Sequence, residues 1–310
     1  MIKKNKSKHS NEIGKKSVLR QIWQNKMAYL LLSPLIIGLL ITCYYPPISG
    51  LYHSFFDWNV TGSATFIELD NFKELFSDPV FLNSVPTLLK LMLPRLLISV
   101  VVPLIMAELI FSVKNKKWQY NYRVMVLLPM VAPGMVYTLL WQKIYDPQLG
   151  LLTTILRGLG LIGQDQIVNW LGDVNLVIPS LIFMGFPWIG GTSVLIYMSG
   201  LMDISGEVIE ATVLDGCSTL KRIIHIDLPL LMGQVKYFLV FGLIGAIQDY
   251  NSQLILTEGG PGYTTYVPGY YMYIKAFTAN RMGYASAVGF VMFIVIFLLT
   301  IFIMRYKKKD

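Results

Sequence analysis

Residues 210–216 read Glu-Ala-Thr-Val-Leu-Asp-Gly, and residues 226–229 read Ile-Asp-Leu-Pro. Both stretches belong to a polar segment, 203–233, which separates two strongly apolar parts of the chain. The segment combines helix-forming residues with residues that cap and end helices. It therefore predicts an order of elements around it: an apolar helix, a short helical hairpin, and a second apolar helix.

The capping residues of this segment indicate where its helices begin and end. Ser205 and Ser218 are each positioned to cap a helix N-terminus. Gly216 stands where a helix end needs a residue that tolerates positive φ, and Pro229 is expected to stop the second helix. Apolar residues recur at helical spacing in both halves, which predicts a compact knob with a partly apolar face. Such a face covers the protein itself, lies in the membrane interface, or docks into a partner.

The composition places the chain among membrane proteins. Hydrophobic residues make up 54% and charged residues only 14% of 310 residues, and the mean hydropathy is +0.55. A soluble domain carries about a quarter charged residues, and apolar runs of about 20 residues are long enough to cross a bilayer as helices. The fold class is therefore all-α and polytopic. Six transmembrane helices are predicted, at 28–49, 88–111, 124–142, 176–201, 235–256 and 285–304.

The basic residues predict the orientation of these helices. They gather before the first apolar run, between the second and third runs, and after the last, and the positive-inside rule assigns all three regions to the cytoplasm. The predicted domains are a basic cytoplasmic tail at 1–27, a six-helix transmembrane domain at 28–304 and a second basic tail at 305–310. Both termini, and the segment 203–233, are then cytoplasmic. The first apolar run, which has no small-residue cleavage site, is expected to remain as a span.

Several functional classes find no support in the residues. The net charge of +8 is distributed by topology and does not indicate nucleic-acid binding. No Cys/His cluster has metal-ligand spacing, and no catalytic cluster is visible. Cys43 and Cys217 fall on different sides of the predicted topology, so no disulfide is expected. Arg95 is expected to extend toward the headgroups, and Glu108 to pair with Lys114 or Lys116.

The segment 203–233 closely resembles the EAA coupling loop of carbohydrate ABC importer permeases. In that family the loop reads E-A-A, two residues, D-G-A, and then, after a short helix, I-x-L-P. Thr212 and Cys217 replace small alanines of that pattern, Ile223 replaces an aromatic residue, and Gly233 stands where a second proline is common. Further segments resemble the same family, including 123–141 and the Leu-Thr-Glu-Gly-Gly-Pro-Gly stretch at 256–262. The resemblance covers the chain from about residue 29 to its end.

This resemblance implies a role for the chain. It is similar to one permease subunit of a binding-protein-dependent sugar importer of the maltose-importer type, with the type I importer fold and a location in a bacterial-type plasma membrane. The implied partners are a second permease, a cytoplasmic ABC ATPase dimer, an extracellular solute-binding protein, membrane lipid and a sugar or oligosaccharide. The chain itself binds no cofactor in this interpretation, because ATP and Mg belong to the partner ATPase and no phosphate-binding loop motif is present. The residues assigned to ATPase coupling are Glu207, Glu210, Ala211, Asp215, Gly216, Leu228 and Pro229.

A substrate pathway is predicted less directly from the residues themselves. Polar residues at membrane depth usually face a cavity or a partner, and the apolar stretch 235–256 contains Gln248, Asp249, Tyr250 and Asn251. Gln248 and Asn251 are expected to share a helix face. Trp188 is a further candidate. Packing against another helix or the partner permease explains the same residues.

Two other classes of membrane protein remain as alternatives. An ion-coupled secondary transporter would normally carry several carboxylates deep in its helices, and Asp249 is the one strong candidate for that role. A membrane-embedded glycan- or lipid-modifying enzyme would need a catalytic cluster. Neither alternative explains the helical knob. The identity of the sugar, and whether this chain touches it, do not follow from the sequence.

Overall fold

The computed structural model describes residues 23–59 and 61–305, and its regular structure is almost entirely helical. The chain divides into two compact units, which meet in sequence between Gly50 and Leu51. Three helical elements follow one another without a break: α2 (Lys26–Leu39), the π-helical turn η1 (Leu40–Tyr44) and α3 (Tyr45–His53). Together they make a helix of 28 residues that is long and apolar enough to cross a membrane, at the position of the first predicted span. The last three residues of α3 belong to the second unit.

After the end of α3, the second unit continues with a small β-hairpin and a short amphipathic helix. Strand β1 (Phe56–Asp57) pairs antiparallel with β2 (Thr65–Phe66), and α4 (Asp70–Ser77) follows. The Asn71 amide of α4 is buried and donates to the carbonyls of Ser54 and Phe56, at 2.9 and 3.0 Å. The Asn71 side chain therefore connects α4 to the backbone at Ser54 and Phe56, and it satisfies the hydrogen-bonding needs of these two carbonyls.

Helix α5 (Pro79–Phe111) is the longest helix of the described chain. Asp78 caps it by accepting hydrogen bonds from the backbone N–H groups of Val80 and Phe81, and Pro79 occupies the first helical position, where its missing N–H costs nothing. This cap starts the helix nine residues before the predicted start of the second span, and the helix also contains three interior prolines, Pro86, Pro94 and Pro103.

The third, fourth and fifth predicted spans are broken helices. The third consists of α6 (Lys116–Leu127), the 3-10 turn η2 (Leu128–Val131) and α7 (Gly134–Ile144), with a bend of 87° between its halves. The fourth consists of α9 (Val177–Phe183) and α10 (Gly191–Met202). The fifth consists of α14 (Met232–Gln248) and η4 (Gln253–Thr257). Each of these three predicted spans therefore contains a break in its helix.

The remaining helices are α8 (Leu151–Gly158), α11 (Gly206–Leu214), α12 (Thr219–Arg222), η3 (Ile223–Asp227), α13 (Leu228–Leu230), α15 (Pro268–Tyr273), η5 (Ile274–Thr278) and α16 (Met282–Arg305). Helix α16 matches the sixth predicted span. By length and composition, the described residues contain three helices able to cross a membrane, or up to five when each bent pair counts as one span. The shorter apolar helix α10 lies in the remaining predicted span.

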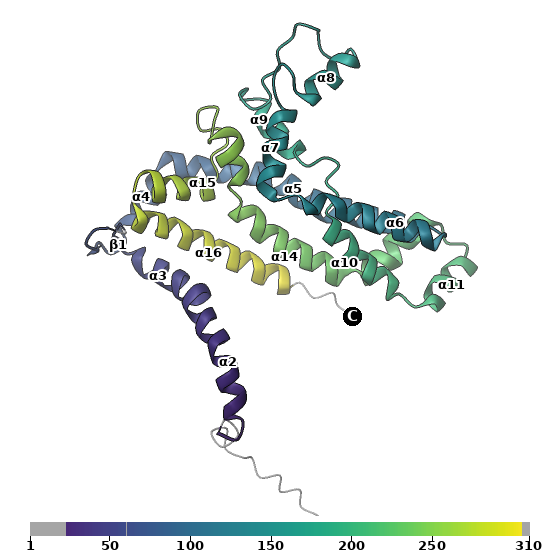
Figure 1. The fold of residues 1–310 in the computed structure, drawn as a ribbon, viewed down its shortest axis with the longest axis horizontal. Coiled ribbons are helices and arrows are strands. Elements are labelled where there is room, and N and C mark those ends of the chain that lie inside the picture. Colours follow the sequence, from purple (N-terminus) through teal and green to yellow (C-terminus); the bar gives the residue numbers. More distant parts are fainter. Residues whose placement is uncertain (1–22, 60, 306–310) are drawn as a thin grey trace, which may run out of the picture. The chain divides into compact units, whose positions relative to one another are not determined.

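Helices α5, α10, α14 and α16 form the body of the second unit (Figure 1). Helix α5 packs against both α10 and α14, and α14 packs against α16. One buried cluster joins α5, α14, α15 and α16 and contains Leu91, Leu243 and Val288. A second joins the C-terminal part of α5 to α10, with Ala107, Val194 and Leu201. Helix α5 therefore belongs to both clusters and connects them.

Candidate functional site

The loop between α10 and α14 folds as the predicted helical hairpin. Ser205 caps α11 by accepting a hydrogen bond from Val208 N–H at 3.4 Å. At the other end, Gly216 has a φ of +64°, and the backbone N–H groups of Gly216 and Cys217 donate to the carbonyls of Val213 and Thr212. This is a Schellman motif, which needs a left-handed residue at that place. The cap and the glycine end were both predicted correctly, because both are set by local sequence.

The predicted coupling residues lie mainly on the open side of this hairpin. Glu207, Glu210, Ala211, Asp215 and Gly216 are all exposed. The last turn of α11 also exposes two apolar side chains, Val213 at 72% and Leu214 at 88%. Thr212 faces the other way and is buried, with its hydroxyl donating to Ile209 O at 2.6 Å. The arrangement presents carboxylates beside an apolar tip that nothing in the described chain covers.

The second half of the hairpin is a single helical segment that contains a π turn. Ser218 caps α12 as predicted, and the helical segment ends at Leu230, one residue after the predicted stop at Pro229. It passes through the π-helical turn η3 to Leu230, where the chain bends by 70° into α14. Pro229 lies in the first turn of α13, where a missing N–H is tolerated. Leu228 and Pro229 are half-buried.

Three charged residues attach this half of the hairpin to α5. The Arg222 Nε donates to Asp227 Oδ2 at 2.9 Å, and Arg222 Nη2 lies 3.7 Å from Glu108 Oε2. The side chains are 17%, 2% and 6% exposed, respectively. Glu108 was expected to pair with a lysine close in sequence, and that expectation is wrong. The structure gives Glu108 a partner more than a hundred residues away, which no local pattern indicates.

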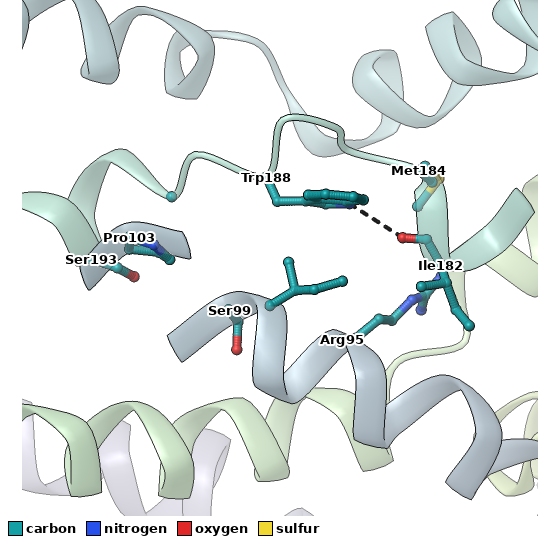
Figure 2. Close-up of a pocket in the computed structure, with 9 residues that line it drawn as sticks. Arg95, Ser99, Pro103, Ile182, Met184, Trp188 and Ser193 are labelled. Carbon is teal, nitrogen blue, oxygen red and sulfur yellow. Dashed lines mark hydrogen bonds between the residues drawn. The ribbon is translucent and has the colours of Figure 1, made fainter. Parts of the chain in front are cut away.

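A cavity of about 280 Å³ lies between α5 and the break that separates α9 from α10. Trp188 of that break faces Arg95 and Ser99 of α5 across it, and Met184 and Ser193 lie on either side (Figure 2). The indole Nε1 donates to Ile182 O at 3.2 Å. Trp188 also has a φ of +56°, a conformation that costs a bulky residue about 1–2 kcal/mol. Strain of this kind is characteristic of functional sites.

Arg95 ties the two breaks in the fourth and fifth spans to α5. Its Nη2 donates to Leu181 O near the end of α9 at 2.7 Å, and its Nη1 donates to Asp249 Oδ2 at 3.3 Å. Asp249 is the residue at which α14 ends. The expectation that Arg95 extends to the headgroups is therefore wrong, because its guanidinium binds a backbone carbonyl near the end of α9 and a carboxylate at the end of α14. A basic residue inside an apolar run was the signal available in the sequence.

The four polar residues of the fifth span are not on one helix face. The helix breaks at Asp249 and Tyr250, and Asp249 Oδ1 accepts from the Asn251 N–H at 3.1 Å to start the next turn. The shared face predicted for Gln248 and Asn251 is thus wrong. Gln248 lines a separate cavity with Met272 and Met292, while Tyr250 stacks on Tyr273 at 5.4 Å. Of the candidates, only Trp188 and Asp249 are connected to the Arg95 cavity.

Comparison with known proteins identifies the family. The model of the binding-protein-dependent transport system inner membrane components matches residues 82–309. The chain belongs to this family. A probable ABC transporter permease protein of Bacillus subtilis, YurN, is 34% identical over 92% of this permease and 97% of its own length. The prediction of an ABC importer permease, a transport subunit whose ATPase is a separate subunit, is confirmed.

Further relatives extend this result. The multiple sugar-binding transport system permease protein MsmF of Streptococcus mutans is 26% identical over 90% of the permease and 94% of its own length. A chain of a bacterial ABC transporter involved in the import of the acidic polysaccharide alginate has the same fold. It matches 94% of the permease and 100% of its own length, with a TM-score of 0.80 at 23% identity. The type I importer fold is therefore confirmed as well.

Proposed function

We propose that this permease is the transmembrane subunit of an ATP-driven importer that moves a sugar or oligosaccharide by alternating access. Several relatives are named for sugar transport, among them MsmF and the arabinooligosaccharide transport system permease protein AraP of Bacillus subtilis. The observation that carries the proposal is the exposed helical hairpin at α11 in a membrane protein of this family. A hairpin with an apolar tip and acidic flanks suits docking into a groove of another protein.

The hairpin faces the cytoplasm in this proposal, and an ABC ATPase dimer binds it. Val213 and Leu214 enter the ATPase groove, while Glu207 and Glu210 pair with basic groups at its rim. Asp215 and Gly216 form the turn that holds α11 at its angle, and Leu228 with Pro229 supports the following helix. A second permease completes the pathway, and a solute-binding protein delivers the sugar from outside. Both termini lie on the ATPase side.

The cavity beside Trp188 is the proposed contact with the sugar in this chain. A sugar ring needs a flat apolar face together with hydroxyl and amide partners. Trp188 offers the flat face, and Ser99 and Ser193 offer hydroxyl groups. The Arg95 charge is already balanced by Asp249, so the lining suits an uncharged sugar. The helix breaks around the cavity fit a transport pathway, since irregular backbone at membrane depth is tolerated where it lines a cavity.

The test is reconstitution. The permease, its partner permease and the ATPase are placed in liposomes with the solute-binding protein outside, and uptake of a panel of labelled neutral mono- to trisaccharides is measured. ATP-dependent accumulation of at least one of these sugars supports the proposal. Accumulation by this chain alone, driven by an ion gradient, would establish the secondary-transporter alternative instead.

A further inference from the structure

The charged cluster of Arg222, Asp227 and Glu108 has no role in binding the ATPase or the sugar as described so far. It is nearly buried, with side-chain exposures of 17%, 2% and 6%. Two carboxylates share one guanidinium, and neither Glu108 oxygen nor Arg222 Nη2 has a hydrogen-bond partner in the described residues. Buried charges without hydrogen bonds are costly. The helical hairpin and α5 are thus joined by a polar contact at a place where apolar packing would cost less free energy.

The position of the cluster gives it a mechanical consequence. Arg222 is fixed inside the hairpin by its short hydrogen bond to Asp227, which lies one turn further along the same helical segment. Glu108 belongs to the last turns of α5, whose end at Ile110 and Phe111 is also held by the Gln119 amide of α6. A displacement of the hairpin therefore acts on the end of α5 through the Arg222–Glu108 contact.

Helix α5 extends this contact to the cavity. Arg95 and Glu108 lie on the same unbroken helix, about 20 Å apart at 1.5 Å per residue. Arg95 holds Leu181 O at the end of α9 and the Asp249 carboxylate at the end of α14. The same helix thus ends at the hairpin in one direction. In the other, its Arg95 lines the cavity and contacts the end of α9 and the end of α14.

We infer that Arg222 is a positioning residue for transport: it passes movement of the hairpin to α5 through Glu108, and α5 passes it to the cavity at Arg95. This inference rests on the proposed function, since it requires an ATPase that moves the hairpin. It adds a role for a cluster outside the proposed ATPase contact and outside the proposed sugar contact. Loss of the contact should separate ATP hydrolysis from the opening and closing of the cavity.

The test follows cavity access directly and does not depend on the sugar. Ser99 is changed to Cys in a background with Cys43→Ser and Cys217→Ser, and the assembled transporter is labelled with a membrane-impermeant maleimide. Labelling rates are compared between the nucleotide-free complex and the complex trapped with ATP and vanadate. We expect the difference between the two states to fall roughly tenfold in Arg222→Gln and in Glu108→Gln, while ATP hydrolysis continues.

Three comparisons make the result specific. The double variant should show no further loss, because both single changes remove the same contact. Arg222→Lys keeps the charge and should restore part of the difference. Lys117→Gln removes an exposed positive charge from α6 and should behave as the parent protein. If Arg222→Gln does not assemble, Glu108→Gln decides alone, because its oxygens accept no hydrogen bond from the described residues.

A parent-like difference in labelling for Arg222→Gln or Glu108→Gln would overturn the inference. Additive losses in the double variant, with no rescue by Arg222→Lys, would also overturn it, since they indicate general destabilisation. If the parent complex itself shows no change in labelling with ATP and vanadate, the proposed function fails, and that outcome is distinct from failure of the inference.

Discussion

Single residues fix how the second unit is held together, and Gly283 is the tightest example. A Cβ at this position of α16 would lie 2.0 Å from the carbonyl oxygen of Phe56 in β1, and the Gly283 N–H donates to Trp58 O at 2.9 Å. The backbone of the β1–β2 hairpin passes directly over α16 at this point, so no side chain fits there. The contact has no signature in sequence, because it joins residues far apart in the chain.

Gly283→Ala is expected to destabilise the protein by about 1–3 kcal/mol, since the backbone must move to admit the methyl group. The measurement is thermal unfolding in detergent. Gly245→Ala is the matched control, because a Cβ there meets no atom within 4 Å. Equal melting temperatures for Gly283→Ala and Gly245→Ala would show that the approach of β1 to α16 is looser than described.

The ion pair between Glu74 and Arg281 predicts a pH dependence at the same scale. The two guanidinium nitrogens of Arg281 lie 2.5 and 2.6 Å from the two Glu74 oxygens, and these hydrogen bonds lower the pKa of Glu74 below its ordinary value of 4.5. A carboxyl whose pKa is lowered by folding adds stability above its unfolded pKa, and loses it as the pH falls through the folded pKa.

Glu74→Gln should therefore lower the melting temperature at neutral pH and make little difference well below pH 4.5. The Glu74 side chain is 44% exposed, so solvent screening limits the effect to about 1 kcal/mol or less. Melting curves across this pH range test it. A difference between parent and variant that stays constant, or grows in acid, would contradict the assignment.

At the scale of elements, the sequence predicts helix ends that are set by neighbouring residues. It does not locate helix breaks that depend on residues far away in the chain. Ser205, Gly216 and Ser218 were placed correctly, since each cap involves groups within a few residues. The positions of the breaks near Trp188 and at Asp249 were not predicted, because they involve Arg95 of another helix, which binds Leu181 O and the Asp249 carboxylate. A hydropathy pattern shows that a segment is apolar, and it carries no information on where a distant guanidinium replaces a helical hydrogen bond.

The break at Asp249 gives a prediction for the element it begins. Asp249→Ala removes both the cap of the following turn and the partner of Arg95, whereas Asp249→Asn keeps an oxygen that can accept from Asn251 N–H. We expect the alanine variant to be less stable than the asparagine variant by about 1–2 kcal/mol, the value of a helix cap. Thermal unfolding of the two purified variants measures this difference. Equal stability would show that the oxygen retained in Asp249→Asn adds nothing as a cap, and that Asp249 contributes only through its charge.

At the scale of the whole molecule, the structure separates two regions and connects them through α5. The exposed hairpin of α11 is at one end, and the strained, cavity-lining segment around Trp188 belongs to the body of the second unit. Family, fold and the composition-based membrane assignment were all available from the sequence. The connection was not, because Arg222 meets Glu108, and Arg95 meets Asp249, only in the folded chain.

The most direct test of the account is the effect of Glu210→Lys on the assembled transporter. Glu210 is exposed on α11 and makes no ion pair with the rest of the described chain, so the substitution leaves the fold intact and reverses the charge offered to the ATPase. Membrane insertion, co-purification with the ATPase and ATP-driven sugar uptake are measured together. We expect normal insertion with loss of ATPase binding and uptake, and normal uptake would show that Glu210 does not couple the permease to the ATPase.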